Sequence, residues 1–155
     1  MRTCVTLSVM CLLLGVSLAG VGAAGEGSGG KPEVYNHVTG ASSEMDRVVH
    51  ATYESRWRVI DISERDGTYT PPRVKDARAP LPVFDVKGDA VRGKVLAFFI
   101  IGPDGRVQDP VIIQASDPRL GPPVLATLAN WTFVPARFKG EAVAATGGEE
   151  FNFPR

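Results

Sequence analysis

The stretch that decides the fold runs from Gly93 to Ala115 and reads GKVLAFFIIGPDGRVQDPVIIQA. Its first part, up to Ile101, is apolar at nearly every position, which predicts a strand covered on both faces. Pro103-Asp-Gly105 predicts a tight turn, because these residue types suit the special backbone positions of turns. The chain then returns as a second strand, which gives an antiparallel hairpin. Pro110 has no N–H donor, which places it at a bulge or on an unpaired edge.

Downstream of the hairpin, the sequence predicts one short helix and two further extended segments. Gly121-Pro-Pro123 begins the helix, since proline is tolerated in a first helical turn. Trp131-Thr-Phe-Val134 and residues 141–153 are predicted strands, and Gly147-Gly148 should weaken the second of them. The order of elements predicts an α+β fold, a small antiparallel β-sheet with one or two short helices packed on a face.

The motifs of this part of the chain, taken in order, resemble the C-terminal domain of TonB-family energy transducers. The family has a Tyr-Pro pair followed by a helix before the first strand, whereas this chain has Phe84-Asp85 and then a glycine-containing segment too short for a good helix. The resemblance covers about residues 80–153. It rests on Gly93-Lys-Val95, Pro103-Asp-Gly-Arg-Val107, Asn130-Trp-Thr-Phe-Val-Pro-Ala-Arg137, Lys139-Gly-Glu-Ala-Val143 and Phe151-Asn-Phe153.

The resemblance implies a periplasmic binding module that serves energy-coupled transport. Members of the family grip an extended peptide of an outer-membrane receptor by adding it to the edge of their sheet. The alternative is a stand-alone structural or adaptor domain of the cell envelope without energy transduction, which the short glycine-rich linker favours. If peptide binding carries over, the binding edge is expected on the last strand, at Glu141, Ala142, Val143, Ala144, Ala145 and Thr146.

The first 24 residues predict an export signal. Arg2 is followed by an uncharged, apolar stretch that ends in small residues at Ala23 and Ala24. This order is typical of a secretory signal peptide, so we expect cleavage and an exported, periplasmic protein. The alternative is an anchor in the inner membrane, because residues 4–24 could just span a bilayer.

The remaining chain is predicted to have a flexible linker at residues 25–42, an upstream helix and strand at 43–70, and the TonB-like domain at 71–155. The first strand of that domain is apolar on both faces, and one short helix can cover only one of them. The other face needs the upstream segment from Glu44 to Ile62, or a second copy of the domain in a homodimer. We expect the intramolecular cover, because a linked segment acts at high effective concentration.

The composition argues against several classes of function. The 17 Lys and Arg residues balance the 17 Asp and Glu residues, so no net field attracts nucleic acid. Both cysteines, Cys4 and Cys11, lie in the leader, and His37 and His50 are the only histidines. The chain has no nucleophile elbow, phosphate loop or metal-ligand spacing. The sequence therefore predicts a protein that is not an enzyme and that needs neither a metal nor a cofactor.

Overall fold

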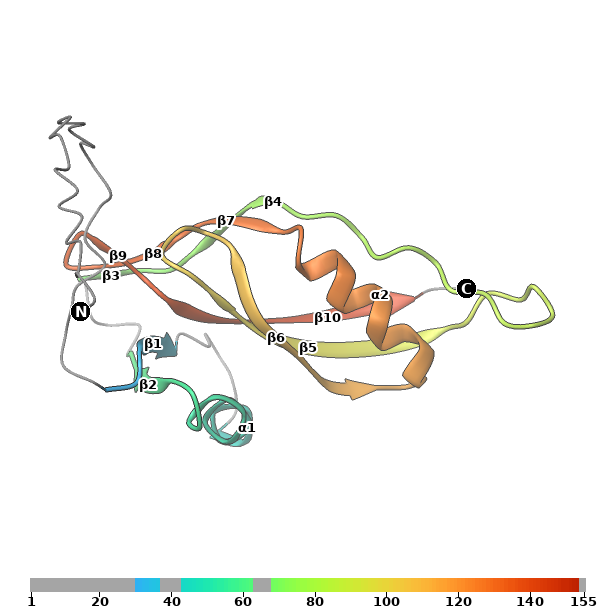
Figure 1. The fold of residues 1–155 in the computed structure, drawn as a ribbon, viewed down its shortest axis with the longest axis horizontal. Helices are drawn as coiled ribbons and strands as arrows, with labels where there is room; N and C mark the ends of the chain where they lie inside the picture. Colours follow the sequence, from blue (N-terminus) through green and yellow to red (C-terminus); the bar gives the residue numbers. More distant parts are fainter. Residues whose placement is uncertain (1–29, 37–42, 63–67, 154–155) are drawn as a thin grey trace, which may run out of the picture. The chain divides into compact units, whose positions relative to one another are not determined.

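The computed structural model describes residues 30–36, 43–62 and 68–153, which form an α+β fold around one five-stranded sheet (Figure 1). The strand order is β2-β1-β10-β5-β6, with β5 antiparallel to both of its neighbours and β1 parallel to both of its own. The α+β class predicted from the sequence is confirmed. The strands are β1 (Glu33–Asn36), β2 (Arg58–Asp61), β5 (Gly93–Ile101), β6 (Val107–Ala115) and β10 (Ala145–Phe153).

Smaller elements complete the fold. Helix α1 (Ser43–Tyr53) connects β1 to β2, and helix α2 (Gly121–Leu128) follows a 3-10 turn at Pro118–Leu120. The prolines of α2 stand in its first turn, as expected. Strand β4 pairs with β7, and β8 pairs with both β3 and β9. These strands are β3 (Tyr69–Thr70), β4 (Arg73–Asp76), β7 (Thr132–Val134), β8 (Ala136–Phe138) and β9 (Glu141–Val143).

The predicted hairpin is present as β5 and β6, and Pro110 lies at a bulge within it. Ile100 is opposite Gln108 and Phe98 is opposite Val111, so the register shifts around Asp109 and Pro110. Strand β6 is also the last strand of the sheet. Pro110 therefore lies at a bulge on an edge strand, so both settings that the sequence allowed for it are met at once.

The turn of the hairpin needs glycine at position 105 for two reasons. Gly105 has a φ of 76°, in the left-handed region. Its carbonyl oxygen also accepts a hydrogen bond from the N–H of Phe133 at 2.8 Å. A Cβ at this position would lie 2.1 Å from the carbonyl oxygen of Phe133. No side chain fits there unless β7 moves away from the turn.

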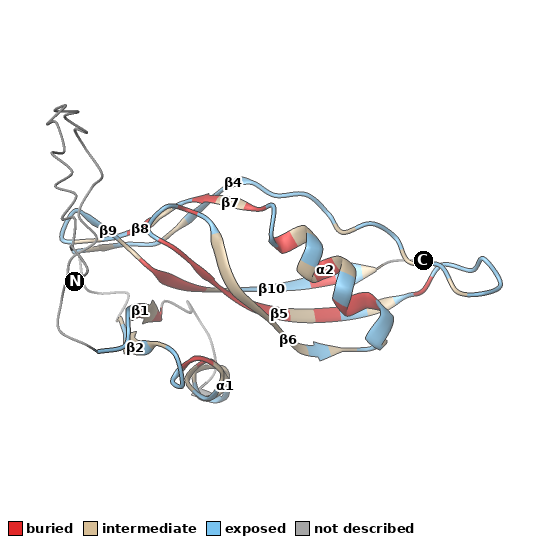
Figure 2. Ribbon diagram, viewed as in Figure 1, coloured by how far each residue is buried: buried red, intermediate tan, exposed pale blue. Residues whose placement is uncertain are grey.

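Both faces of β5 are buried, as predicted (Figure 2). On the face that carries α2, side chains of β5 pack with the helix and with an aromatic cluster. On the opposite face, Phe98 and Ile100 pack with residues of β1 and α1. The α2 face consists of Val95, Ala97, Phe99, Ile101, Leu120, Val124, Leu128, Trp131, Phe133 and Phe151.

The cover of the second face comes from the upstream segment, which confirms the intramolecular alternative. Val34, Val49 and Tyr53 are at most 1% exposed and contact the same cluster as Phe98 and Ile100. Helix α1 presents its apolar side to the sheet because these residues recur at helical spacing. The upstream segment is thus part of the core of this domain.

The end of α1 is fastened to the bulge of β6 through Asp109. The carboxylate of Asp109 accepts hydrogen bonds from the indole N–H of Trp57 at 2.8 Å and from the guanidinium of Arg56 at 2.9 Å. The hydroxyl of Tyr53 donates to the Asp109 carbonyl at 3.2 Å. Asp109 has a φ of 46°, so the bulge turns this residue out of the regular ladder toward the helix.

Two expectations from the sequence need correction. Residues 33–36 were expected in a flexible linker, but they form β1, because Val34 is fully buried and the strand pairs on both sides. Gly147 and Gly148 were expected to weaken the last strand. They lie opposite Phe99 and Phe98, and a Cβ at either position would come within 2.8 Å of the opposing ring. The glycines therefore leave the space that the two rings of β5 fill.

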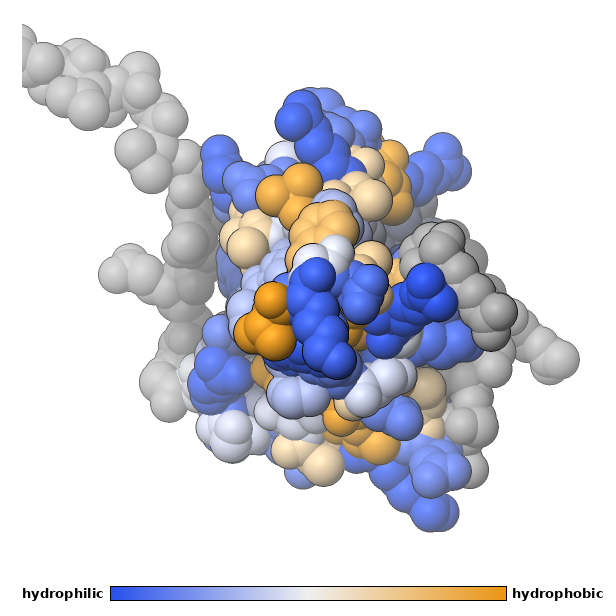
Figure 3. All heavy atoms as spheres, turned by 90° about the vertical axis from the view of Figure 1, so that its right-hand side faces the viewer, coloured by the Kyte–Doolittle hydropathy of each residue, from blue (hydrophilic) through white to orange (hydrophobic). Residues whose placement is uncertain are grey.

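Residues 84–90 form a small turn in place of the family's helix, as expected from their sequence. Phe84 bridges to Ala90, and the Asp85 carboxylate accepts hydrogen bonds from the N–H groups of Lys87 and Asp89. Phe84 and Val86 are exposed. Figure 3 looks from the side of this turn and shows apolar groups interspersed with hydrophilic ones.

The predicted leader, residues 1–24, lies outside the described residues. Neither α1 nor α2, nor any other helical segment of the described residues, has the length and hydrophobicity of a membrane-spanning helix.

Candidate peptide-binding edge

The first half of the predicted binding edge is paired within the chain. Glu141, Ala142 and Val143 form β9, which is antiparallel to β8. Glu141 lies opposite Phe138, and Val143 lies opposite Ala136. This hairpin is separate from the central sheet, so these residues do not belong to the long last strand as the sequence suggested.

The second half of the predicted edge is occupied by β1. The carbonyl oxygen of Ala144 accepts a hydrogen bond from the N–H of Tyr35 at 2.9 Å, and Ala145 pairs with Tyr35. The hydroxyl of Thr146 donates to the side-chain oxygen of Asn36 at 2.9 Å. Thr146 and Asn36 are only 3% and 4% exposed. A strand of the same chain thus fills the position at Ala144–Thr146 where an external strand was expected.

Farther along β10, from Gly147 to Phe153, the side of the strand that faces away from β5 has a different environment. All residues of β10 pair with β5 on one side. On the other side, no strand among residues 30–36, 43–62 and 68–153 pairs with Gly147–Phe153. Backbone groups alternate along a strand, and the Ala144 carbonyl faces β1. The backbone groups of Gly148, Glu150 and Asn152 therefore face outward.

Charged side chains flank this open stretch. The ammonium of Lys94 lies 2.9 Å from a carboxylate oxygen of Glu150, across β5 and β10. This hydrogen bond and the charge of Lys94 lower the pKa of Glu150. Glu149 and Asn152 are also exposed, whereas Phe151 is buried with its ring 5.4 Å from that of Trp131. Charges of this kind keep an exposed edge from pairing indiscriminately.

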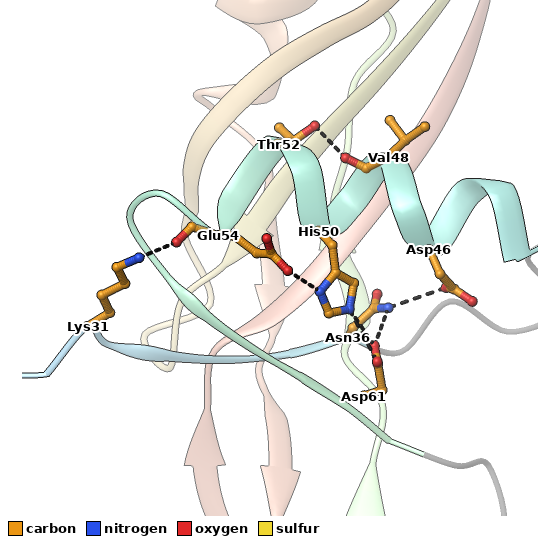
Figure 4. A network of polar contacts seen from close by, with 8 residues as sticks. All are labelled: Lys31, Asn36, Asp46, Val48, His50, Thr52, Glu54 and Asp61. Atoms are coloured by element: carbon orange, nitrogen blue, oxygen red, sulfur yellow. Dashed lines mark hydrogen bonds and ion pairs between the residues drawn. The ribbon is translucent and has the colours of Figure 1, made fainter.

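A polar network holds β1 in its place on the sheet (Figure 4). The side-chain amide of Asn36 donates to Asp61 at 2.9 Å and to Asp46 at 3.3 Å. The ring nitrogens of His50 lie 2.8 Å from Glu54 and 3.1 Å from Asp61. Asn36 thus joins β1 to β2, to α1 and, through Thr146, to β10.

The charge of His50 should tune the strength of this network. Its pKa is raised, first by the hydrogen bond to Glu54 and then by the one to Asp61. A group with a raised folded-state pKa stabilises the fold fully below its unfolded-state pKa of about 6.5, and that contribution is lost as pH rises through the folded-state pKa. The stabilisation that His50 provides should therefore be larger in mild acid than in alkali.

We expect His50→Gln to lower the free energy of unfolding by at most about 1 kcal/mol at about pH 5.5, with little effect at about pH 9. Urea unfolding of both proteins at the two pH values measures the difference. His37 is present in both proteins, so its titration cancels. A difference that is the same at both pH values would show that the charge of His50 does not contribute.

The sequence did not identify β1 as part of this region. Its only local signal is Val34 and Tyr35 between polar residues, which is too short to distinguish a strand from an extended linker. No group of three or more potential metal-ligating side chains occurs in the described ranges. What the region offers chemically is an open backbone edge with charged and apolar side chains beside it.

Comparison with known proteins agrees with the motifs. Residues 87–154 match the family described as the Gram-negative bacterial TonB protein C-terminal. A similar solved structure is the solution NMR structure of the Pseudomonas aeruginosa TonB CTD, with 26% identity, a TM-score of 0.37, and coverage of 61% of this chain and 95% of that chain. No curated protein matches the chain. The resemblance to the TonB C-terminal family that the motifs indicated is thus confirmed for residues 87–154.

Proposed function

We propose that this protein is a periplasmic binding module that takes up an extended segment of an outer-membrane receptor by β-strand addition, in energy-coupled transport. The observation that carries the proposal is the outer side of β10 from Gly147 to Phe153, which pairs with no strand among the described residues. Main-chain hydrogen bonds to such an edge supply affinity, and neighbouring side chains supply selectivity. The family match supports a role in binding at the cell envelope.

We place the proposed site farther along the chain than Glu141–Thr146, the residues expected from the sequence. Glu141–Val143 and Ala144–Thr146 already contact β8 and β1. A peptide that replaced either strand would have to break existing hydrogen bonds. The outward backbone groups of Gly148, Glu150 and Asn152 belong to no ladder within the described part of the chain. Addition beside Gly147–Phe153 is therefore the less costly route.

The alternative function is an adaptor that does not transmit force. It differs from an anchored transducer in that its leader, residues 1–24, is cleaved. The inclusion of residues 33–36 and 43–61 in the fold favours this alternative, because these residues do not act as a spacer. The intact mass of the protein isolated from cells distinguishes the two. Loss of residues 1–24 supports a free periplasmic adaptor, and their retention in the membrane fraction supports an anchored transducer.

A proline at position 150 tests the edge directly. The N–H of Glu150 faces away from β5, so Glu150→Pro should remove an outward donor and leave the ladder to β5 intact. Twelve-residue peptides selected from a random library on the wild-type protein serve as the probe. We expect Glu150→Pro to weaken their binding about tenfold, which corresponds to about 1.4 kcal/mol.

Glu150→Ala is the matched control, because it removes the same carboxylate and keeps the N–H. It should bind the peptides within about twofold of the wild-type protein. Isothermal titration calorimetry measures the affinities, and circular dichroism verifies that both variants are folded. Equal binding by Glu150→Pro and Glu150→Ala would refute addition at this edge.

A further inference from the structure

A groove runs between helix α2 and the segment that follows β4, residues 77–82 (Figure 1). Its volume is about 810 Å³, and both of its walls belong to residues 68–153, which the structure describes without a gap. No residue of β10 lines it. The groove is therefore a different surface from the proposed binding edge of β10.

The wall opposite α2 is held in place by the chain itself. Ala79 and Leu81 each precede a proline, which restricts both residues to extended conformations. The indole N–H of Trp131 donates to the Arg78 carbonyl at 2.9 Å, and Val83 packs against the core cluster on the α2 face. A groove whose walls are already fixed orders few of its own residues when a partner binds, which favours affinity.

The walls of the groove are largely apolar, although they face solvent. Leu81 is 78% exposed, and Ala126 on α2 is exposed as well. Residues 121–130, which comprise α2 and the two residues after it, carry no charged side chain. A surface helix ordinarily carries charged residues on its solvent side. An uncharged helix next to an exposed leucine is typical of a surface that a partner covers.

Unpaired cations lie at one end of the groove. Asp76 pairs with Thr132, which follows α2, so the segment begins beside the C-terminal end of the helix. Arg73, Lys75 and Arg78 are exposed in this part of the chain. Neither they nor Asp76 form an ion pair with another described residue. Three positive charges against one negative charge therefore leave this end of the groove positive.

The positive end is a local feature, because the charges of the whole chain balance. Elsewhere in the described residues several cations are neutralised by a carboxylate, as Arg56 is by Asp109 and Lys94 by Glu150. An apolar groove that ends in unpaired cations is complementary to a partner that is apolar at one point and acidic beside it.

We infer that the groove binds an extended segment of a partner protein in which apolar residues adjoin acidic ones. The apolar residues lie between α2 and Leu81, and the acidic residues lie over Arg73, Lys75 and Arg78. A helix and an extended segment that run alongside each other leave a linear channel, which suits an extended chain. Guanidinium groups bind carboxylates with paired hydrogen bonds, so the arginines favour acidic residues.

The fluorescein-labelled peptide Glu-Glu-Glu-Leu-Pro-Leu-Glu-Glu-Glu is the probe, and its fluorescence anisotropy with the full chain measures binding. Acidic residues flank its apolar centre on both sides, so it fits the groove in either direction. We expect saturable binding that Arg78→Glu weakens at least about tenfold and Leu81→Ser at least about threefold. Both side chains are exposed, so both variants should stay folded, which circular dichroism verifies.

Lys87→Glu is the matched control, because it makes the same change of charge at an exposed residue outside the groove. At physiological ionic strength it should bind the acidic peptide within about twofold of the wild-type protein. The peptide Lys-Lys-Lys-Leu-Pro-Leu-Lys-Lys-Lys should not compete. Equal weakening by Arg78→Glu and Lys87→Glu, or no saturable binding up to about 1 mM protein, would overturn the inference.

Glu150→Pro separates the groove from the proposed function. It should leave the affinity for the acidic peptide unchanged within about twofold, because Glu150 does not line the groove. Loss of acidic-peptide binding in Glu150→Pro would place the peptide at β10 and overturn the groove, with the proposed function left standing. If library peptides bind Glu150→Pro and Glu150→Ala equally while the acidic peptide still requires Arg78, only the proposed function fails. A dimer in light scattering that Leu81→Ser abolishes would assign the groove to a second copy of the chain and would also overturn the inference.

Discussion

Replacing Trp131 by alanine is expected to lower the free energy of unfolding by about 3–5 kcal/mol, the range for buried aromatic residues. Trp131 is 8% exposed, and its ring lies 6.2 Å from those of Phe99 and Phe133 and 5.4 Å from that of Phe151. Its indole N–H donates to the Arg78 carbonyl at 2.9 Å. The substitution therefore removes the centre of the aromatic cluster and the hydrogen bond to the Arg78 carbonyl.

Urea unfolding followed by circular dichroism measures this loss, and Val134→Ala is a suitable control. Val134 lies on the strand that follows Trp131 but is 49% exposed, so its truncation should cost less than about 1 kcal/mol. A loss of under about 1 kcal/mol for Trp131→Ala would mean that the cluster does not depend on the indole. Such a result would contradict the packing of the α2 face.

A chain that begins at Thr68 is expected to lose its monomeric state or unfold. It lacks β1, α1 and β2, which cover Phe98 and Ile100 on the second face of the sheet. Exposure of each large side chain costs roughly 1.5–3 kcal/mol. Two of them therefore bring a loss comparable with the lower range of domain stabilities, about 5 kcal/mol.

Light scattering after gel filtration measures the oligomeric state of the shortened chain, and urea unfolding measures its stability. Asp109→Ala in the full chain is the matched control, because it breaks the attachment of α1 but keeps the apolar cover. It should remain monomeric and lose about 1–3 kcal/mol. A shortened chain that is monomeric and as stable as the full chain would show that the upstream segment contributes nothing to the core.

Local patterns in the sequence were sufficient to predict most of the C-terminal part of the fold. The run from Gly93 to Ile101 required two covers, and the structure supplies α2 on one face and α1 on the other. Pro110 predicted its bulge, and Gly105 predicted its turn. In each case the structure depends on the residue itself or on its near neighbours in the chain. The local sequence is therefore enough to predict it.

Pairing between distant strands was not predictable in the same way. Gly147 and Gly148 look unfavourable in isolation and become necessary only beside Phe99 and Phe98. Strand β1 is too short for its periodicity to be recognised, and what stabilises it is contact with residues over a hundred positions away. The pairing of Tyr35 with Ala145 was missed for the same reason, since nothing near Ala145 in the sequence indicates a partner strand so far away.

The position of β1 between β2 and β10 also constrains how the chain reaches its native state. Asn36 and Thr146, which bond to each other, are 110 positions apart. The β1–α1–β2 unit comes first in the described chain. Its neighbour in the sheet is β10, the last strand, so β1 has no partner on that side until β10 has been synthesised. Closing so long a loop is slow compared with forming the β5–β6 hairpin. The native sheet is therefore completed only when the two ends of the described chain meet, later than the hairpin against which α1 packs.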